Sequence, residues 1–168
     1  MVTIKKVYNA VEYYVDDKLH RTDGPAIYHF DGDKGWYFNG IHHREDGPAV
    51  EHKNYKTMWC IDNKIHRLDG PAVIYKNGDR EWYVNGFHHR LDGPAIDSSE
   101  CKKWIIFNQL HRLDGPATEY IKSKYWYQKN EPHREDGPAI ELSNGNVEYW
   151  FCGIRYSIED YKKLLKLD

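Results

Sequence analysis

The chain has 168 residues, of which 40% are hydrophobic, 15% aromatic and 30% charged, with a formal net charge of -2. Because positive and negative charges nearly balance, no overall field would hold the chain on nucleic acid or an anionic membrane, and the composition argues against both partners. No apolar run is long enough for a signal peptide or a membrane span, and Cys60, Cys101 and Cys152 lack metal-ligand spacing. We therefore expect a cytoplasmic protein with reduced thiols, without a metal and without a cofactor.

Residues 1–19 are predicted to form an incomplete hairpin at the start of an all-β chain. The 14 tyrosines and 6 tryptophans of the sequence favour strands over helices, and the segment from Val2 to Tyr14 is rich in β-branched and aromatic residues. An incomplete hairpin would leave an exposed strand edge, whose unpaired N–H and C=O groups can pair with a second molecule. A homodimer is therefore one expected partnership of this chain.

Residues 20–156 are dominated by a repeat. The seven-residue string His-Arg-x-Asp-Gly-Pro-Ala occurs six times, beginning at His20, His43, His66, His89, His111 and His133. The intervals are 23, 23, 23, 22 and 22 residues, which indicates that one small unit has been copied along the chain. We expect a single repeat domain over residues 1–168, in which about seven hairpins stack into an elongated, twisted sheet.

Each copy is predicted to be one hairpin. In a middle copy, two runs of β-branched and aromatic residues, 72–75 and 81–84, flank Asn77-Gly78, a pair that tolerates the positive φ of a tight turn. Asn85-Gly86 and Asp92-Gly93 mark further turns before the next copy begins. Turn signals at intervals of about 8–12 residues are typical of all-β folds.

The second strand of each hairpin places two rows of residues on opposite faces, because successive side chains alternate. The first row is predicted to be core and consists of Tyr13, Trp36, Trp59, Trp82, Trp104, Trp126 and Tyr149. A β-branched row on the first strand is expected to pack on the same side and consists of Ile27, Val50, Val73, Ile96, Thr118 and Ile140. The second row is expected to face solvent, and its rigid aromatic members form a candidate protein-binding surface: Tyr14, Tyr37, Tyr83, Tyr127 and Trp150.

Two segments depart from the regular repeat. Between residues 97 and 132, two copies lack the Asn-Gly turn, so the loops there are either neutral variation or a partner-facing patch. Residues 157–168 are predicted to form a capping helix, because Ser157 is a good N-cap residue. The helical face expected to be apolar contains Ile158, Tyr161, Leu164 and Leu165.

The repeat resembles the membrane occupation and recognition nexus (MORN) repeat. The matching elements in one copy are Trp82, Gly86, His89 and Asn77-Gly78, and the resemblance covers roughly residues 7 to 156. The connection after the histidine is longer here, and this variant string resembles uncharacterised proteins of bacteriophages and large DNA viruses. The resemblance implies a single-layered sheet that serves as a scaffold or protein-binding surface. Lipid binding, credited to some MORN-like arrays, is disfavoured because the chain has no basic surplus.

The recurring histidine and arginine raise the question of metal or phosphate binding. Equivalent residues in neighbouring copies should lie about 9–10 Å apart, too far to share a metal ion. The simpler interpretation is a structural ladder, in which the aspartate caps its own turn and the arginine reaches the turn of the next copy. The alternative is an anion groove that cradles the phosphates of a small nucleotide and uses Arg44, Arg67, Arg90, Arg112 and Arg134.

No catalytic residue is assigned, and an enzyme is not expected. No Ser or Cys recurs beside a histidine as a nucleophile, and a string present in six copies offers six equivalent environments where an active site needs one special one. The sequence favours a non-enzymatic binding protein that acts by surface occlusion or scaffolding. The resemblance to viral proteins implies a virus-encoded accessory protein that binds and inhibits a host defence protein in the host cytosol. The alternatives are a small-anion or nucleotide-signal binder that uses the arginine edge, and a purely structural or assembly scaffold.

Overall fold

The structure is a computed structural model that describes residues 2–166, which form 26 strands and one helix. The prediction of an all-β chain of hairpins with a short C-terminal helix is confirmed. Residue contacts divide the chain into two compact units, Met1–Phe87 and His88–Asp168, which we call unit 1 and unit 2 and describe one at a time.

Unit 1 is an antiparallel sheet of hairpins. Its main strands are β1 (Val2–Val7), β2 (Ala10–Val15), β3 (Lys18–Leu19), β4 (Ile27–His29), β5 (Lys34–Gly35), β8 (Val50–Glu51), β9 (Lys56–Met58), β12 (Val73–Tyr75) and β13 (Arg80–Glu81). They follow each other in the order β1-β2-β4-β5-β8-β9-β12-β13, with β3 paired to β2. Every pairing in this series is antiparallel, so each hairpin continues the ladder of the preceding one.

The first hairpin of unit 1 is complete, which corrects the expectation of an incomplete one. Val2 pairs with Val15 and Val7 pairs with Ala10. The strand β1 lies at one end of the strand order, and all six of its residues are exposed. Its outer edge fits the expected pairing site for a second copy, and the homodimer stays a prediction.

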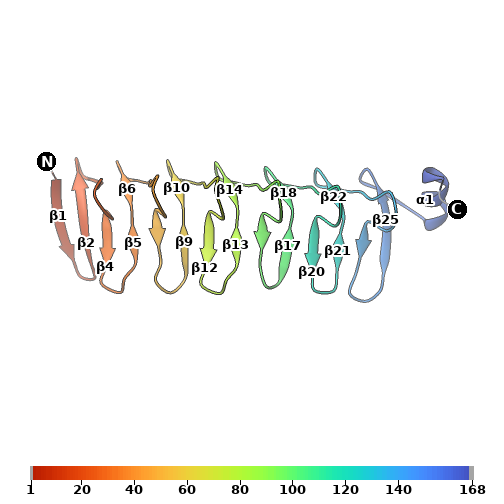
Figure 1. Cartoon of the computed structure of the whole chain (residues 1–168), viewed down its shortest axis with the longest axis horizontal. Coiled ribbons are helices and arrows are strands. Elements are labelled where there is room, and N and C mark those ends of the chain that lie inside the picture. Colours follow the sequence, from red (N-terminus) through yellow and green to blue (C-terminus); the bar gives the residue numbers. More distant parts are fainter. Residues whose placement is uncertain (1, 167–168) are drawn as a thin grey trace. The chain divides into compact units, whose positions relative to one another are not determined.

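Each repeat contains a second, smaller hairpin that the sequence did not indicate as separate. In unit 1 these are β6 (Tyr37–Phe38) with β7 (Ile41–His42) and β10 (Cys60–Ile61) with β11 (Lys64–Ile65), while β14 (Tyr83–Val84) leads to β15 (Phe87–His88) at the junction of the units. Figure 1 shows these short hairpins at the upper ends of the longer strands. The strand expected over residues 81–84 is therefore divided at its tryptophan.

The tryptophan position divides the strand because its peptide groups bond to the string. The Trp59 N–H donates to the Ala72 carbonyl at 2.9 Å, and the Trp59 carbonyl accepts from the His66 N–H at 3.1 Å. The same pair of bonds holds Trp36 in unit 1 and Trp104 and Trp126 in unit 2. The turn residues behave as predicted, since Gly78 adopts φ +94°, a conformation that residues with a side chain rarely adopt.

Unit 2 repeats the same pattern and ends in the helix. Its main strands are β16 (Ile96–Asp97), β17 (Cys101–Lys103), β20 (Thr118–Tyr120), β21 (Lys124–Tyr125), β24 (Ile140–Glu141), β25 (Val147–Phe151) and β26 (Ile154–Tyr156), adjacent in that order. The small hairpins are β18 (Ile105–Ile106) with β19 (Gln109–Leu110) and β22 (Tyr127–Gln128) with β23 (Glu131–Pro132).

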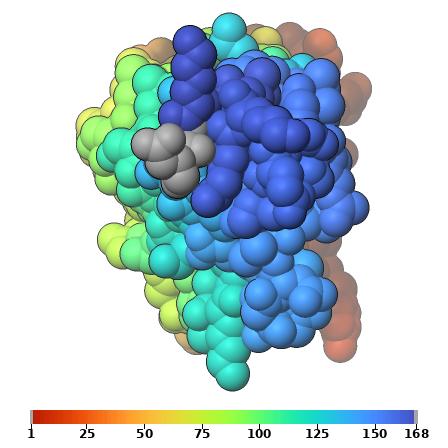
Figure 2. Space-filling view, turned by 90° about the vertical axis from the view of Figure 1, so that its right-hand side faces the viewer, coloured from red at the N-terminus to blue at the C-terminus, as the bar shows by residue number. Residues whose placement is uncertain are grey.

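The helix α1 (Ile158–Leu165) packs on the last strands of unit 2, and Figure 2 looks onto this end of the unit. Ser157 is the predicted N-cap and accepts a hydrogen bond from the Asp160 N–H at 3.1 Å. Tyr161 is only 1% exposed, whereas Ile158 and Leu164 are 42% and 45% exposed, so the expected four-residue apolar face is wrong. Tyr161 is the buried side chain of the helix, and Leu165 has intermediate exposure. Residues 167 and 168 of the predicted helix lie outside the described residues.

Apart from Tyr161, the fully buried residues of both units are small. Each string ends in an alanine with no exposed surface, and these are Ala26, Ala49, Ala72, Ala95, Ala117 and Ala139. In unit 1, Val50, Val73 and Cys60 are buried beside them, and in unit 2 Ile105 and Thr118 are buried. With so few large side chains buried among the described residues, the backbone ladders and the packing of the strings carry much of the stability.

The tryptophan row is half-buried, so its assignment as the closed core is wrong. All five tryptophans from Trp36 to Trp126 have intermediate exposure, and Phe38, two residues after Trp36, is 44% exposed. The β-branched row lies on the other face. Val50 is paired with Gly35, and directly opposed residues of two strands share a face of the sheet. That face is the one of Tyr37, because a Cβ on Gly35 would lie 2.8 Å from the Tyr37 ring. Val50 therefore packs with the tyrosine row.

Candidate binding surface

The candidate site is formed by the six His-Arg-x-Asp-Gly-Pro-Ala strings, which are irregular loops between hairpins. We call them the string loops. They span residues 20–26, 43–49 and 66–72 in unit 1 and residues 89–95, 111–117 and 133–139 in unit 2. Their repetition comes from three sets of contacts, made by the arginine, the histidine and the glycine.

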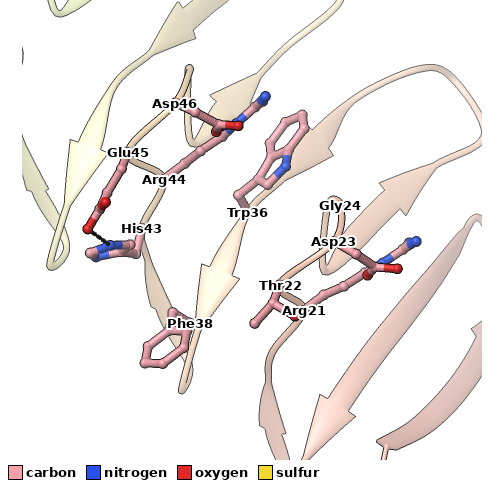
Figure 3. A pocket seen from close by; sticks show the side chains of 10 residues that line it. All are labelled: Arg21, Thr22, Asp23, Gly24, Trp36, Phe38, His43, Arg44, Glu45 and Asp46. Carbon is pink, nitrogen blue, oxygen red and sulfur yellow. Dashed lines mark hydrogen bonds and ion pairs between the residues drawn. The ribbon is translucent and has the colours of Figure 1, made fainter.

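The arginine of each string loop is clamped within its own loop. In the loop 43–49, Arg44 Nε donates to Asp46 Oδ1 at 2.8 Å, Nη1 donates to the Pro48 carbonyl at 3.3 Å, and Cζ lies 4.2 Å from the centroid of the Trp36 ring. Figure 3 shows Arg44 between Trp36 and Asp46. Across the six loops the Nε to Oδ1 distance is 2.7–2.9 Å.

The glycine of the loop makes room for this clamp. A Cβ on Gly47 would lie 2.8 Å from Arg44 Cζ, closer than carbon atoms normally approach. The other five string-loop glycines would place a Cβ at 2.8–3.2 Å from the same arginine atom. The guanidinium is therefore held between an aromatic ring and a glycine, and its charge is satisfied by the aspartate and the proline carbonyl.

The histidine joins each loop to the next repeat. His43 Nδ1 accepts from the Asp62 N–H at 3.2 Å, and His111 Nδ1 accepts from the Lys129 N–H at 3.3 Å. The backbone N–H of the arginine also crosses to the next repeat, as from Arg44 to the Cys60 carbonyl at 3.0 Å. The expectation that the arginine side chain reaches the next turn is wrong. That side chain bonds to its own loop and, for Arg112 and Arg134, to Glu119 or Glu141 of the strand that follows, and the backbone N–H makes the connection to the next turn.

The arginines proposed as an anion groove point inward, and the aspartates point outward. Arg44, Arg67, Arg90, Arg112 and Arg134 have side chains that are 19–23% exposed, and the aspartates bonded to them are 82–85% exposed. The hydrogen bond from the arginine holds the pKa of each of these aspartates below its usual range, so the carboxylates are charged at neutral pH. An anion would have to displace a carboxylate to reach the guanidinium.

The tyrosine row is half-buried rather than open to solvent. In unit 1, the Tyr14 and Tyr83 hydroxyls donate to Glu12 and Glu81 at 2.7 and 2.8 Å, and the Tyr37 and His42 rings lie at a tilt with their centroids 4.0 Å apart. Burial raises the pKa of Tyr37, Tyr83 and, in unit 2, Tyr127.

Two residues that occupy the equivalent position in other copies are buried. Cys60 in unit 1 is 3% exposed, and Ile105 in unit 2 is 7% exposed. Trp150, the last member, has intermediate exposure, and its Nε1 donates to Glu148 at 2.8 Å. The row therefore offers less free surface than the alternation of strand residues suggested.

The most exposed apolar residues of the string loops stand at the variable position x, which the sequence analysis did not select. This position holds Thr22, Glu45 and Leu68 in unit 1 and Leu91, Leu113 and Glu135 in unit 2. The three leucines are 76–79% exposed. The sequence feature that could have identified this position is that it alone varies within an otherwise constant string. In the irregular segment 97–132, Ile121 is also 84% exposed, in the turn between β20 and β21.

Consecutive string loops enclose open grooves over the tryptophan position. In unit 1 the loops 20–26 and 43–49 flank Trp36 and Phe38, as Figure 3 shows. In unit 2 the loops 89–95 and 111–117 flank Trp104 and Ile106, and the loops 111–117 and 133–139 flank Trp126 and Gln128. These grooves have the same framework, and they differ at the x position and at the residue two places after the tryptophan.

Comparison with known proteins adds no family. No protein-family model matches the sequence, and a search of curated proteins finds no match. Within residues 2–166, no group of three or more His, Cys, Asp or Glu side chains has an arrangement that could hold a metal ion. None of the helices in this described part of the chain is long and apolar enough to cross a membrane.

Proposed function

We propose that this chain is a non-enzymatic protein-binding scaffold whose string loops contact the partner. The observation that carries the proposal is the exposure of Leu68, Leu91 and Leu113 at a loop position where other copies hold threonine or glutamate. Folding of the loop therefore does not require leucine. Large apolar side chains that project from a rigid framework without a structural need are typical of interaction surfaces.

The contacts of the string loops argue against the two other classes of function. The arginine, histidine and glycine of each loop are engaged in holding the repeat, and the same arrangement recurs in all six copies. A catalytic site needs one special environment. A phosphate would meet the exposed aspartates before the clamped arginines, which disfavours the nucleotide alternative. The resemblance to MORN repeats, which serve as scaffolds, supports the same choice.

The proposal is tested by panning a random-peptide display library on the immobilised full chain. The counter-target is a variant with Leu68→Glu, Leu91→Glu and Leu113→Glu. Glutamate is compatible with the loop, because the loops 43–49 and 133–139 already have it at position x. We expect clones that bind the wild-type chain and fail on the variant. Clones that bind both equally, or no enrichment at all, would refute the loop surface.

The nucleotide alternative is tested by thermal melting with nucleotides, cyclic nucleotides and inorganic phosphate. A ligand present at about a hundred times its dissociation constant stabilises a protein by about 2.7 kcal/mol, which a melting curve detects readily. We expect no shift. A clear shift that disappears in Arg112→Ala would replace the scaffold proposal with a small-anion binder.

A further inference from the structure

We infer that one groove of unit 2 seats an apolar side chain of an extended partner segment whose neighbouring residues are lysine or arginine. We call it the leucine groove. It lies between the loops 89–95 and 111–117, has a volume of about 690 Å³, and has Leu91 and Leu113 at its rims with Trp104 and Ile106 between them. The inference rests on the proposed function and adds to it the location of the contact and the chemistry of the partner.

Two other grooves with the same framework are more polar than the leucine groove. In the equivalent groove of unit 1, Thr22 and Glu45 stand where the leucine groove has Leu91 and Leu113 (Figure 3). The next groove of unit 2 has Glu135 at one rim and Gln128 between the loops. All three share the tryptophan and the clamped arginines, so the difference lies in side chains that the fold leaves free to vary.

The two leucines are placed to enclose a guest side chain. Leu91 is 77% exposed and Leu113 is 76% exposed, so each has most of its surface available to a partner. Ile106 and Trp104 lie between them and have intermediate exposure. A side chain of leucine or phenylalanine size would remove apolar surface from water on both rims and between them at once, as the central anchors of protein interfaces do.

The charges around the groove determine which partner residues can flank that side chain. Asp92 and Asp114 follow the leucines and are each 85% exposed, whereas the guanidinium groups of Arg90 and Arg112 are 23% and 20% exposed. The rim that a partner meets is therefore negative, although the sum of these four charges is zero. Such a rim attracts lysine and arginine and repels phosphate, which favours a basic protein segment over a nucleotide or a nucleic acid.

The inference is tested with a synthetic peptide in which leucine alternates with lysine, titrated against the full chain by fluorescence anisotropy. We expect binding that weakens at least about tenfold in the double variant Leu91→Glu/Leu113→Glu, because both apolar rims are lost. The matched control Leu68→Glu, in unit 1, should bind like the wild type. Asp92→Asn with Asp114→Asn should weaken binding and reduce its salt dependence.

Two control peptides separate the apolar from the basic requirement: one with serine for leucine and one with glutamate for lysine. Both should fail to bind. Absence of binding by the leucine–lysine peptide up to millimolar concentration, or equal binding by the Leu91→Glu/Leu113→Glu variant, would overturn the inference. Panning clones that require the leucines but contain no basic residue would also overturn it, and they would leave the proposed scaffold function intact.

Discussion

Replacing Gly47 with alanine should destabilise unit 1 by displacing the clamped arginine. The added Cβ would lie 2.8 Å from Arg44 Cζ, so the guanidinium has to move away from the Trp36 ring. Gly47 does not have a positive φ, so the backbone itself accepts alanine. The cost is therefore limited to what the clamp contributes, because a flexible side chain can swing into solvent.

The magnitude follows from the contacts that are lost. The cation–π contact contributes about 0.5–1 kcal/mol at an exposed site. The hydrogen bond from Arg44 Nη1 to the Pro48 carbonyl is long, at 3.3 Å, and contributes about 1 kcal/mol, and the exposed ion pair with Asp46 adds little. Alanine also lowers the conformational entropy of the unfolded chain, which stabilises the folded variant by about 0.5 kcal/mol. The net loss is about 1–1.5 kcal/mol, which corresponds to a melting temperature lower by about 2–6 °C.

Thermal denaturation of Gly47→Ala, compared with Gly70→Ala, measures this effect. At Gly70 the Cβ would lie 3.2 Å from Arg67 Cζ, so that arginine needs to yield less and the loss should be smaller. In the Gly47→Ala variant the pKa of Asp46, followed by NMR, should rise toward its usual value as Arg44 leaves. A variant as stable as the wild type, with an unchanged Asp46 pKa, would refute the clamp.

Three further predictions concern the helix, the thiols and acid. Tyr161→Phe should lower the free energy of unfolding by about 1–2 kcal/mol in urea denaturation, because its hydroxyl donates to two backbone carbonyls of the loop 133–139; an unchanged midpoint would contradict this. Burial raises the pKa of Cys60 to about 11, so iodoacetamide at neutral pH should alkylate the exposed Cys152 and leave Cys60 unmodified in peptide mass spectrometry. The arginine hydrogen bond lowers the pKa of Asp46 in the folded chain. The stabilisation that this carboxylate gives the folded chain should therefore be present above about pH 4 and lost as the pH falls through the lowered pKa. In Asp46→Asn the melting temperature should fall less steeply with acid.

The hairpins and the helix start could be predicted because their signals are local. Asn77-Gly78 marks a turn through the conformational freedom of two adjacent residues, and the structure has the turn there. Ser157 caps the helix through a bond to a residue three positions later. The faces of the strands could not be predicted in the same way. Alternation assumes an unbroken strand. At Trp36, Trp59, Trp104 and Trp126 the chain leaves the main ladder, and the tryptophan N–H bonds to an alanine 13 positions further on, such as Ala72 for Trp59.

The candidate surface was only partly visible in the sequence. The recurring arginine and aspartate indicated a structural role, but the sequence analysis directed the arginine to the next copy, and the structure bonds it to the aspartate of its own loop. The direction in which each group points could not be inferred, because it depends on the tryptophan and glycine that hold the guanidinium inward. In the sequence, position x is the one position of the string that varies, and its residue types did not indicate a function. Its role in the candidate surface follows from the exposure of its leucine side chains in the structure.

By itself, the sequence determined that this chain is a series of antiparallel hairpins with a terminal helix, because period, turn residues and capping act over a few neighbouring positions. Only the tertiary structure decided which face is buried, which charge of each ion pair meets the solvent, and which leucines of successive loops border one groove. The arginine clamp arises from contacts within one repeat, and the groove arises from successive loops that lie next to each other. Residue spacing in the sequence specifies neither.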